Sequence, residues 1–264
     1  MDSVWLAFGI TFLAGLATVI GGALVFFQKS PSPRMLAFGL AFAGGAMVFV
    51  SLTEIFQKSN ASFSVVYGDA GFNYATFAFL AGLFLVMAID RLVPNPHDTL
   101  NAHDPNFSEQ NQNYIRHIGL MAAFAITAHN FPEGLATFFA TLESPTLGAP
   151  LAFAIAVHNI PEGISIAAPI YFATKNKKLT LIACFLSGLA EPVGALVGYF
   201  VLKSVLSDAV FGAVFGLIAG IMVFLALDEL LPAAKRYSQG HETVYGLVVG
   251  MFVMSLSLVL FRVV

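Results

Sequence analysis

Two nearly identical seven-residue stretches carry the residues best suited to chemistry in this sequence. They are residues 128–134 (AHNFPEG) and 157–163 (VHNIPEG). Each holds a histidine and a glutamate four positions apart, and such residues lie on one face of an α-helix. Imidazole and carboxylate groups are ligands for Zn²⁺, Mn²⁺, Fe²⁺ and Co²⁺. The repeat therefore predicts a metal site with four candidate ligands, His129, Glu133, His158 and Glu162, and places an asparagine amide, Asn130 or Asn159, beside each pair.

The elements that must position these residues are membrane-spanning helices. Of the 264 residues, 58% are hydrophobic and 10% charged, and the mean hydropathy is +0.83, whereas soluble domains have about 25% charged residues. Runs of roughly 20 apolar residues can cross the hydrocarbon core of a bilayer as a helix. The sequence predicts an all-α integral membrane protein, one domain over 1–264, with eight transmembrane helices: 4–26, 35–56, 72–93, 117–140, 147–172, 179–203, 208–231 and 243–263.

The basic residues orient these helices. With eight spans, nine basic residues lie on one side: Lys29, Arg34, Arg91, Arg116, Lys175, Lys177, Lys178, Lys235 and Arg236. The other three, Lys58, Lys203 and Arg262, lie on the opposite side. Cytoplasmic loops carry the excess of Lys and Arg, so both termini are expected outside the cytoplasm, in a protein of the plasma or inner membrane. The polar stretch 94–116, with His97 and His103, is then a cytoplasmic loop, either a flexible linker or a weak metal-collecting segment.

The two motifs are expected at the same depth in the membrane, where they can face each other. His129 lies about 12 residues from the inner end of its run, and His158 about 11 from the outer end of its own. At about 1.5 Å per residue, both are roughly 17–18 Å deep, near the midplane. A third acid, Glu191, reaches the same level about 12 residues into the sixth run. Pro132 and Pro161 each remove a backbone donor, so we expect both motif helices to be broken there.

The charges at this depth need a partner. Carboxylates near the midplane are expensive unless they are neutralised. Every Lys and Arg lies in a loop or at the end of a run, so the compensating cations must be protons or a metal. A lone intramembrane His or Glu can be a simple helix contact, but two copies at matched depth with a third acid favour metal ligation. Ser51, Ser187 and Thr127 are interpreted as helix contacts.

Four further acids lie near the ends of predicted spans. Glu54 is at the outer end of the second, and Asp90, Asp228 and Glu229 are near the inner ends of the third and seventh. They could mark the path by which a cation enters and leaves. Alternatively, they extend into the interface or pair locally, as Asp90 could with Arg91.

The motifs closely resemble those of the ZIP (Zrt/Irt-like) metal transporters, specifically the bacterial zinc-transporter branch, over essentially the whole chain. The resemblance implies uptake of Zn²⁺, and also Fe²⁺, Mn²⁺, Co²⁺ or Cd²⁺, into the cytoplasm by a homodimer. It also implies a binuclear site. One ion would be held by His129, Glu133, His158 and Glu162, and the other by Asn130, Asn159 and Glu191, with the two motif glutamates bridging.

Two other functions remain open beside transport. The first is an intramembrane metal-dependent hydrolase, although the sequence lacks His-Glu-x-x-His. A metal-sensing receptor is weaker, because no sizeable soluble domain is present. We expect no enzyme activity, no prosthetic group and no nucleic-acid partner. The expected partners are divalent metal ions, the lipid bilayer and a second copy of the chain.

Overall fold

The computed structural model describes residues 2–27, 33–91, 127 and 130–263. Every regular element in these ranges is helical, as the composition predicts. The predicted loop 94–116, with His97 and His103, lies outside the described residues, as does half of the fourth predicted span.

The first part of the chain consists of α-helices joined by short 3-10 and π-helical turns. α1 (Asp2–Leu24) ends in a 3-10 turn (Val25–Phe27). The next helix consists of α2 (Pro33–Val50), a π-helical turn (Ser51–Ile55) and α3 (Phe56–Tyr67). A 3-10 turn (Gly68–Ala70) then reverses the chain into α4 (Gly71–Asp90). Gly68 has a φ of 56°, a conformation that glycine adopts at no steric cost.

The second part is described from residue 130 onward. Its helices are the segment 130–143, α6 (Pro145–Thr174), α7 (Lys177–Gly188), α8 (Ala190–Leu202), α9 (Asp208–Leu225), a π-helical turn (Ala226–Leu230), α10 (Leu231–Tyr237) and α11 (Glu242–Val263). The first of these carries the first motif from Asn130 onward, and α6 carries the second.

The structure corrects the expected break at Pro161. α6 is one continuous α-helix from Pro145 to Thr174, because a proline removes only one backbone donor and the other bonds of the helix remain. The break lies instead in the sixth predicted span, where α7 and α8 meet at Leu189. Pro192 follows three residues later and cannot donate to the carbonyl of Gly188.

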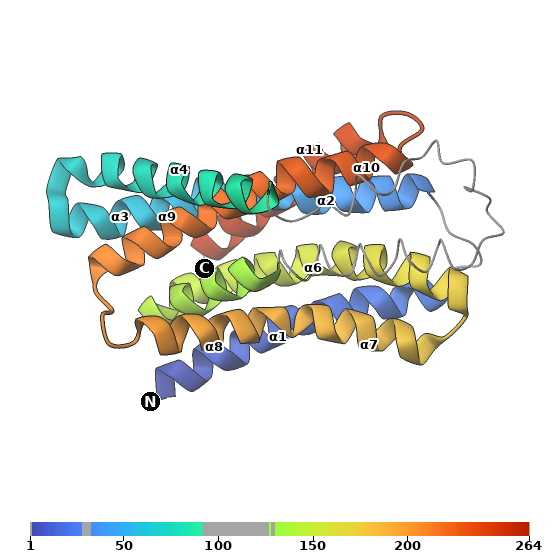
Figure 1. The fold of residues 1–264 in the computed structure, drawn as a ribbon, viewed down its shortest axis with the longest axis horizontal. Helices are drawn as coiled ribbons and strands as arrows, with labels where there is room; N and C mark the ends of the chain where they lie inside the picture. Colours follow the sequence, from blue (N-terminus) through green and yellow to red (C-terminus); the bar gives the residue numbers. More distant parts are fainter. Residues whose placement is uncertain (1, 28–32, 92–126, 128–129, 264) are drawn as a thin grey trace.

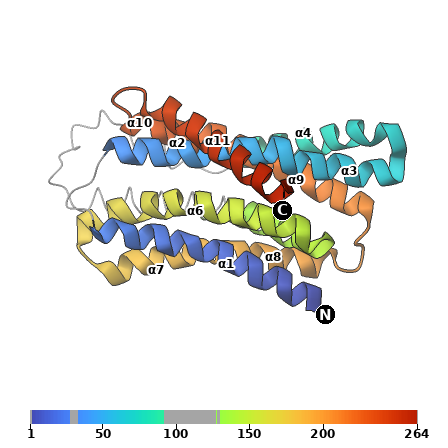
Figure 2. The ribbon, with the colours of Figure 1, turned by 180° about the vertical axis from the view of Figure 1, so that it is seen from behind.

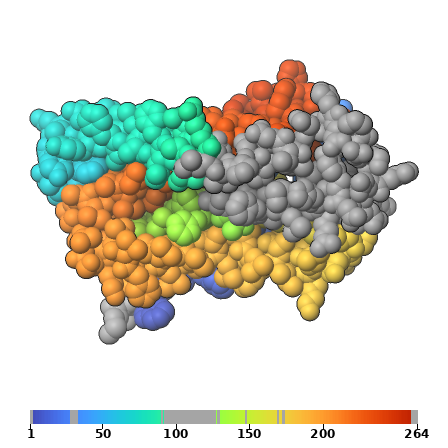
Figure 3. Space-filling view, in the orientation of Figure 1, coloured from blue at the N-terminus to red at the C-terminus, as the bar shows by residue number. Residues whose placement is uncertain are grey.

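Six stretches of the described residues are long and apolar enough to cross a membrane. One of them, Pro33–Ile89, has 57 residues. At about 1.5 Å per residue it is too long for one crossing, and it folds back at Gly68. α4, α8 and α9 form much of one face of the molecule (Figure 3). Large apolar side chains of these helices are exposed, among them Phe77 of α4 and Phe200 of α8, at 68% and 61%. Large exposed apolar side chains suit contact with lipid.

The helices form two layers, which Figures 1 and 2 show edge-on. The upper layer of Figure 1 contains α2, α3, α4, α9, α10 and α11, and the lower layer contains α1, segment 130–143, α6, α7 and α8. The two layers meet chiefly where α2 and α11 lie against α6. Both motifs therefore belong to the lower layer.

Glycines bring the backbones of the lower layer into direct contact. A Cβ at Gly21 of α1 would overlap the carbonyl of Ile160 in α6, and one at Gly163 would overlap that of Thr18. Small residues allow such close approach where lipid supplies no hydrophobic driving force between helices. The segment around the second motif is thus fixed against α1.

Candidate metal centre

Three helices of the lower layer supply the candidate ligands. Asn130 and Glu133 lie in segment 130–143, and Glu191 lies in the first turn of α8. His158, Asn159 and Glu162 lie near the middle of α6. All six side chains are fully buried, at 0% exposure. The seventh predicted ligand, His129, lies outside the described residues.

The two motifs meet face to face. Nε2 of His158 lies 3.0 Å from Oε1 of Glu133. With Glu162, each side chain offers one ligand atom, and the three atoms lie within 4.8 Å of one another. Nitrogen and oxygen ligands of zinc lie about 2.0–2.2 Å from the ion, so only a small contraction would place one ion among them.

The two motif asparagines are oriented by hydrogen bonds from their amide nitrogens. Asn130 donates to the carbonyl of Ser187 at 3.1 Å and to its hydroxyl at 3.4 Å. Asn159 donates to Oε1 of Glu191 at 2.5 Å and to the carbonyl of Ala14 at 3.0 Å. In both residues the amide oxygen is thereby left without a hydrogen-bond partner.

The polar atoms of the site are mostly unsatisfied. Besides the two amide oxygens, Oε2 of Glu133, Nδ1 of His158, both carboxylate oxygens of Glu162 and Oε2 of Glu191 have no hydrogen-bond partner among the residues that the structure describes. No Lys or Arg within the described ranges forms an ion pair with these three acids. Burial of unpaired polar groups costs several kcal/mol, roughly 2–7 for each. The donor set is therefore suited to a divalent cation.

Two supporting groups come from outside the motifs. Ser187 was interpreted as a helix contact, and its carbonyl and hydroxyl indeed accept from Asn130. The carbonyl of Ala14 in α1 was not foreseen, because any residue type could supply it. The only local signal is the neighbouring Gly15, which lets α1 approach Gly188 closely.

The three predicted path acids whose side chains the structure describes, Glu54, Asp228 and Glu229, are not part of this cluster. Glu54 lies in the first π-helical turn, with its Oε1 3.7 Å from Nζ of Lys58. Asp228 and Glu229 lie in the second π-helical turn and are half-buried. Asp90 is the last residue of α4, and its side chain lies outside the described part of the chain. For Glu54, the local ion pair agrees with the alternative interpretation.

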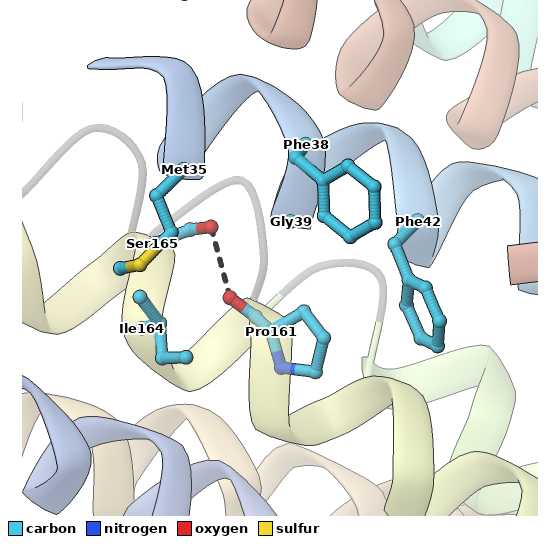
Figure 4. A pocket seen from close by; sticks show the side chains of 7 residues that line it. All are labelled: Met35, Phe38, Gly39, Phe42, Pro161, Ile164 and Ser165. Atoms are coloured by element: carbon cyan, nitrogen blue, oxygen red, sulfur yellow. Dashed lines mark hydrogen bonds between the residues drawn. The ribbon is translucent and has the colours of Figure 1, made fainter. Parts of the chain in front are cut away.

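A cavity of about 250 Å³ adjoins the site between the layers. It is lined by Met35, Phe38, Gly39 and Phe42 of α2 and by Pro161, Ile164 and Ser165 of α6 (Figure 4). Ser165 donates to the carbonyl of Pro161 at 2.9 Å and so satisfies its own hydroxyl. The cavity begins one residue from Glu162 and is mostly apolar.

Comparison with known proteins identifies the family. Residues 93–258, more than half of the chain, match the family described as ZIP Zinc transporter. The chain belongs to the ZIP zinc transporter family. Its relatives include proteins named zinc transporter ZupT. The one from Neisseria meningitidis serogroup C is 68% identical over 263 residues, covering 99% of this chain and 98% of the relative.

Two further relatives extend the comparison. The ZupT protein of Xanthomonas campestris pv. campestris is 69% identical over 261 residues, 98% of this chain and 96% of its own length. That of Chlorobaculum parvum is 48% identical over 266 residues, covering 98% and 99%. The chain is therefore a multi-pass membrane transporter and not an enzyme, which excludes the intramembrane hydrolase.

Proposed function

We propose that this ZIP transporter carries zinc across the membrane into the cytoplasm, with Glu133, His158 and Glu162 holding the ion near the midplane. The unpaired, fully buried ligand atoms of these residues carry the proposal. The zinc transporters at 68–69% identity support the choice of metal. Imidazole and carboxylate ligands without thiolates suit an ion that must be released.

The proposed topology has eight spans with both termini outside the cytoplasm. The fourth proposed span is 117–140, and residues 130–140 are its outer part. The excess of basic residues, nine against three, on the side of 28–32 and 175–178 supports this orientation. Uptake is then movement from the side of the termini to that of the basic loops.

We propose a second ion site beside the first. The free amide oxygens of Asn130 and Asn159 and Oε2 of Glu191 are its ligands, while Glu133 and Glu162 bridge the two ions and His129 completes the first. Imidazole and carboxylate ligands also bind Fe²⁺, Mn²⁺ and Co²⁺, so these ions are proposed as further cargo, together with Cd²⁺ on the family resemblance. The family resemblance supports a homodimer, which cross-linking in lipid bilayers would test.

The two-layer architecture offers a route for the ion. All described ligands lie in the lower layer, whose helices are joined by direct glycine contacts. The upper layer contacts them where α2 and α11 lie against α6, and the cavity lies between α2 and α6. Movement of one layer against the other would open the site to each side in turn, the general scheme of secondary transporters.

Zinc flux into liposomes tests the proposal. The purified protein is reconstituted in liposomes that enclose a zinc-sensitive dye, and Zn²⁺ is added outside the liposomes. We expect the wild type to fill the lumen faster than empty liposomes, and Glu162→Gln to reduce the rate to that of empty liposomes. Asp69→Asn is the matched control, because Asp69 is an exposed acid in the α3–α4 turn. Equal flux through Glu162→Gln and the wild type would refute the assignment of the site.

A further inference from the structure

A lysine is buried at the outer end of the upper layer. Lys58, in the first turn of α3, is only 8% exposed. Its ammonium lies 3.7 Å from Oε1 of Glu54, one turn earlier, and has no hydrogen-bond partner within the described part of the chain. A buried ammonium is expensive to desolvate, and one long ion pair compensates only part of that penalty. A lysine that served only to keep α3 soluble would extend into water.

The π-helical turn directs this lysine toward the interior of the molecule. Gly39 of α2 faces the cavity between the layers. In an uninterrupted α-helix, at about 100° per residue, Lys58 would lie roughly 100° away from Gly39 around the helix axis. The π-helical turn Ser51–Ile55 adds one residue to a turn. With that residue, Lys58 comes back to nearly the same side of the helix as Gly39.

A carboxylate of the other layer faces the same charge. Glu143 lies ten residues beyond Glu133 on segment 130–143, about 15 Å nearer the outer end. Partial burial raises the pKa of the Glu143 carboxyl, the Lys58 ammonium acts in the opposite sense, and the Asp208 carboxylate adds to the rise. The positive charge of Lys58 therefore interacts with carboxylates of both layers. Glu54 belongs to the same layer as Lys58, and Glu143 belongs to the opposite layer.

We propose that Lys58 is a tethered cation that closes the outer end of the ion path. Its ammonium pairs with Glu54 of the upper layer and attracts Glu143 of the lower layer, and so holds the layers together outside the metal centre. A divalent cation arriving from outside is attracted by the same carboxylates and displaces the ammonium, which opens the path. This gate rests on the proposed uptake function, because it needs an ion that enters from the side of the termini.

The single cysteine of the chain allows a direct test of closure. Cys184 is replaced by serine, and Ser51→Cys is introduced as a reporter. Ser51 is fully buried, has an unpaired hydroxyl and lies one helical turn deeper than Glu54. A membrane-impermeant thiol reagent is added on the side of the termini, and the labelling rate is measured.

We expect slow labelling with Lys58 present and labelling faster by about tenfold in Lys58→Met, which corresponds to about 1.4 kcal/mol. Lys58→Arg keeps the charge and should stay slow. Lys203→Met, at an exposed lysine near the outer end of α8, is the matched control and should label like the parent. Zinc binding at the midplane, measured on the same variants, shows that each is folded.

Two results would overturn the gate. One is an unchanged labelling rate in Lys58→Met while the denatured protein labels fully. The other is equal acceleration by Lys58→Arg and Lys58→Met, which would assign the effect to packing and not to charge. Neither result depends on zinc flux. A failure of the gate is therefore distinct from a failure of uptake, which would appear as flux no faster than in empty liposomes.

Discussion

Nε2 of His158 and Oε1 of Glu133 lie 3.0 Å apart, although 25 residues separate them in the chain. This contact joins the two copies of the motif across segment 130–143 and α6. It places an imidazole and a carboxylate where a zinc ion could bind between them, with Glu162 beside both. A cation that inserts there replaces a hydrogen bond with two coordinate bonds. The pair is therefore the natural starting point for tests of the site.

Zinc should stabilise the folded transporter through Glu162. A ligand that binds only the folded state stabilises it by about 2.7 kcal/mol at 100 times its Kd, and the thermal midpoint in detergent should rise accordingly. Glu162→Gln should lose this rise. Without zinc its midpoint should be equal to or above that of the wild type, because an unpartnered buried carboxylate is removed. A full zinc-induced rise in the variant would exclude Glu162 as a ligand.

Asn159→Asp should make the fold depend on metal. The amide nitrogen of Asn159 donates to Glu191 and to the carbonyl of Ala14, and an aspartate oxygen cannot donate to either. Loss of these bonds at a buried site should cost about 1–3 kcal/mol of stability without zinc. With zinc, the extra carboxylate should allow a larger stabilisation than in the wild type. Asn73→Asp, at an exposed position of α4, is the control. Equal zinc-free stability of Asn159→Asp and wild type would contradict the prediction.

Gly21→Val should destabilise the lower layer. A side chain at Gly21 would meet the backbone of Ile160, two residues from His158. Overpacking of this kind costs typically about 1–3 kcal/mol, measured as a lower thermal midpoint, and it should also weaken zinc binding because α6 must shift. Gly9→Val on the same helix has open space around it and should change little. If both variants melt alike, the close approach of α1 and α6 is not needed.

Gly39→Phe should slow transport without unfolding the protein. A Cβ at Gly39 meets only Pro161, at an ordinary contact distance of 3.8 Å, and the cavity has about 250 Å³ of space. A phenylalanine can therefore fill the cavity between α2 and α6. We expect zinc flux to fall by about tenfold or more, as expected when a misplaced group obstructs a functional step. Zinc binding should remain, and Gly9→Phe serves as the control. Normal flux through Gly39→Phe would show that the ion does not use this side of α6.

Glu54→Gln should weaken the apparent affinity for zinc more than it lowers the maximal rate. Charged groups at the mouth of a path raise the local concentration of a cation by about tenfold or more, and this affects KM. Initial uptake rates over a range of zinc concentrations give both constants. Asp69→Asn, an exposed acid nearby, should leave both constants unchanged. An unchanged KM in Glu54→Gln would mean that Glu54 serves only its ion pair with Lys58.

Local spacing in the sequence was enough to predict which motif residues share a helix face. His158 and Glu162 are four residues apart, and a helix of 3.6 residues per turn brings them to one face whatever surrounds it. The scarcity of charge predicted helices in a membrane. The equal depths predicted that Glu191 would reach the site, and in the structure it accepts a hydrogen bond from Asn159. These inferences depend only on the helical period and on the lengths of the apolar runs.

The tertiary structure decided what depends on contacts between helices. Pro161 and Pro192 are both prolines within apolar runs, yet α6 continues through the first while the chain changes helix just before the second. A proline in an apolar run is therefore not sufficient to predict where a helix ends. The orientation of Asn159 depends on the Ala14 carbonyl, and α1 supplies it only because glycines let backbones touch. In the sequence, Lys58 was only one of the three basic residues on the side opposite the basic loops. Its burial became visible only with the π-helical turn and the opposite layer in place, because side-chain direction across a packed interface is a property of both surfaces.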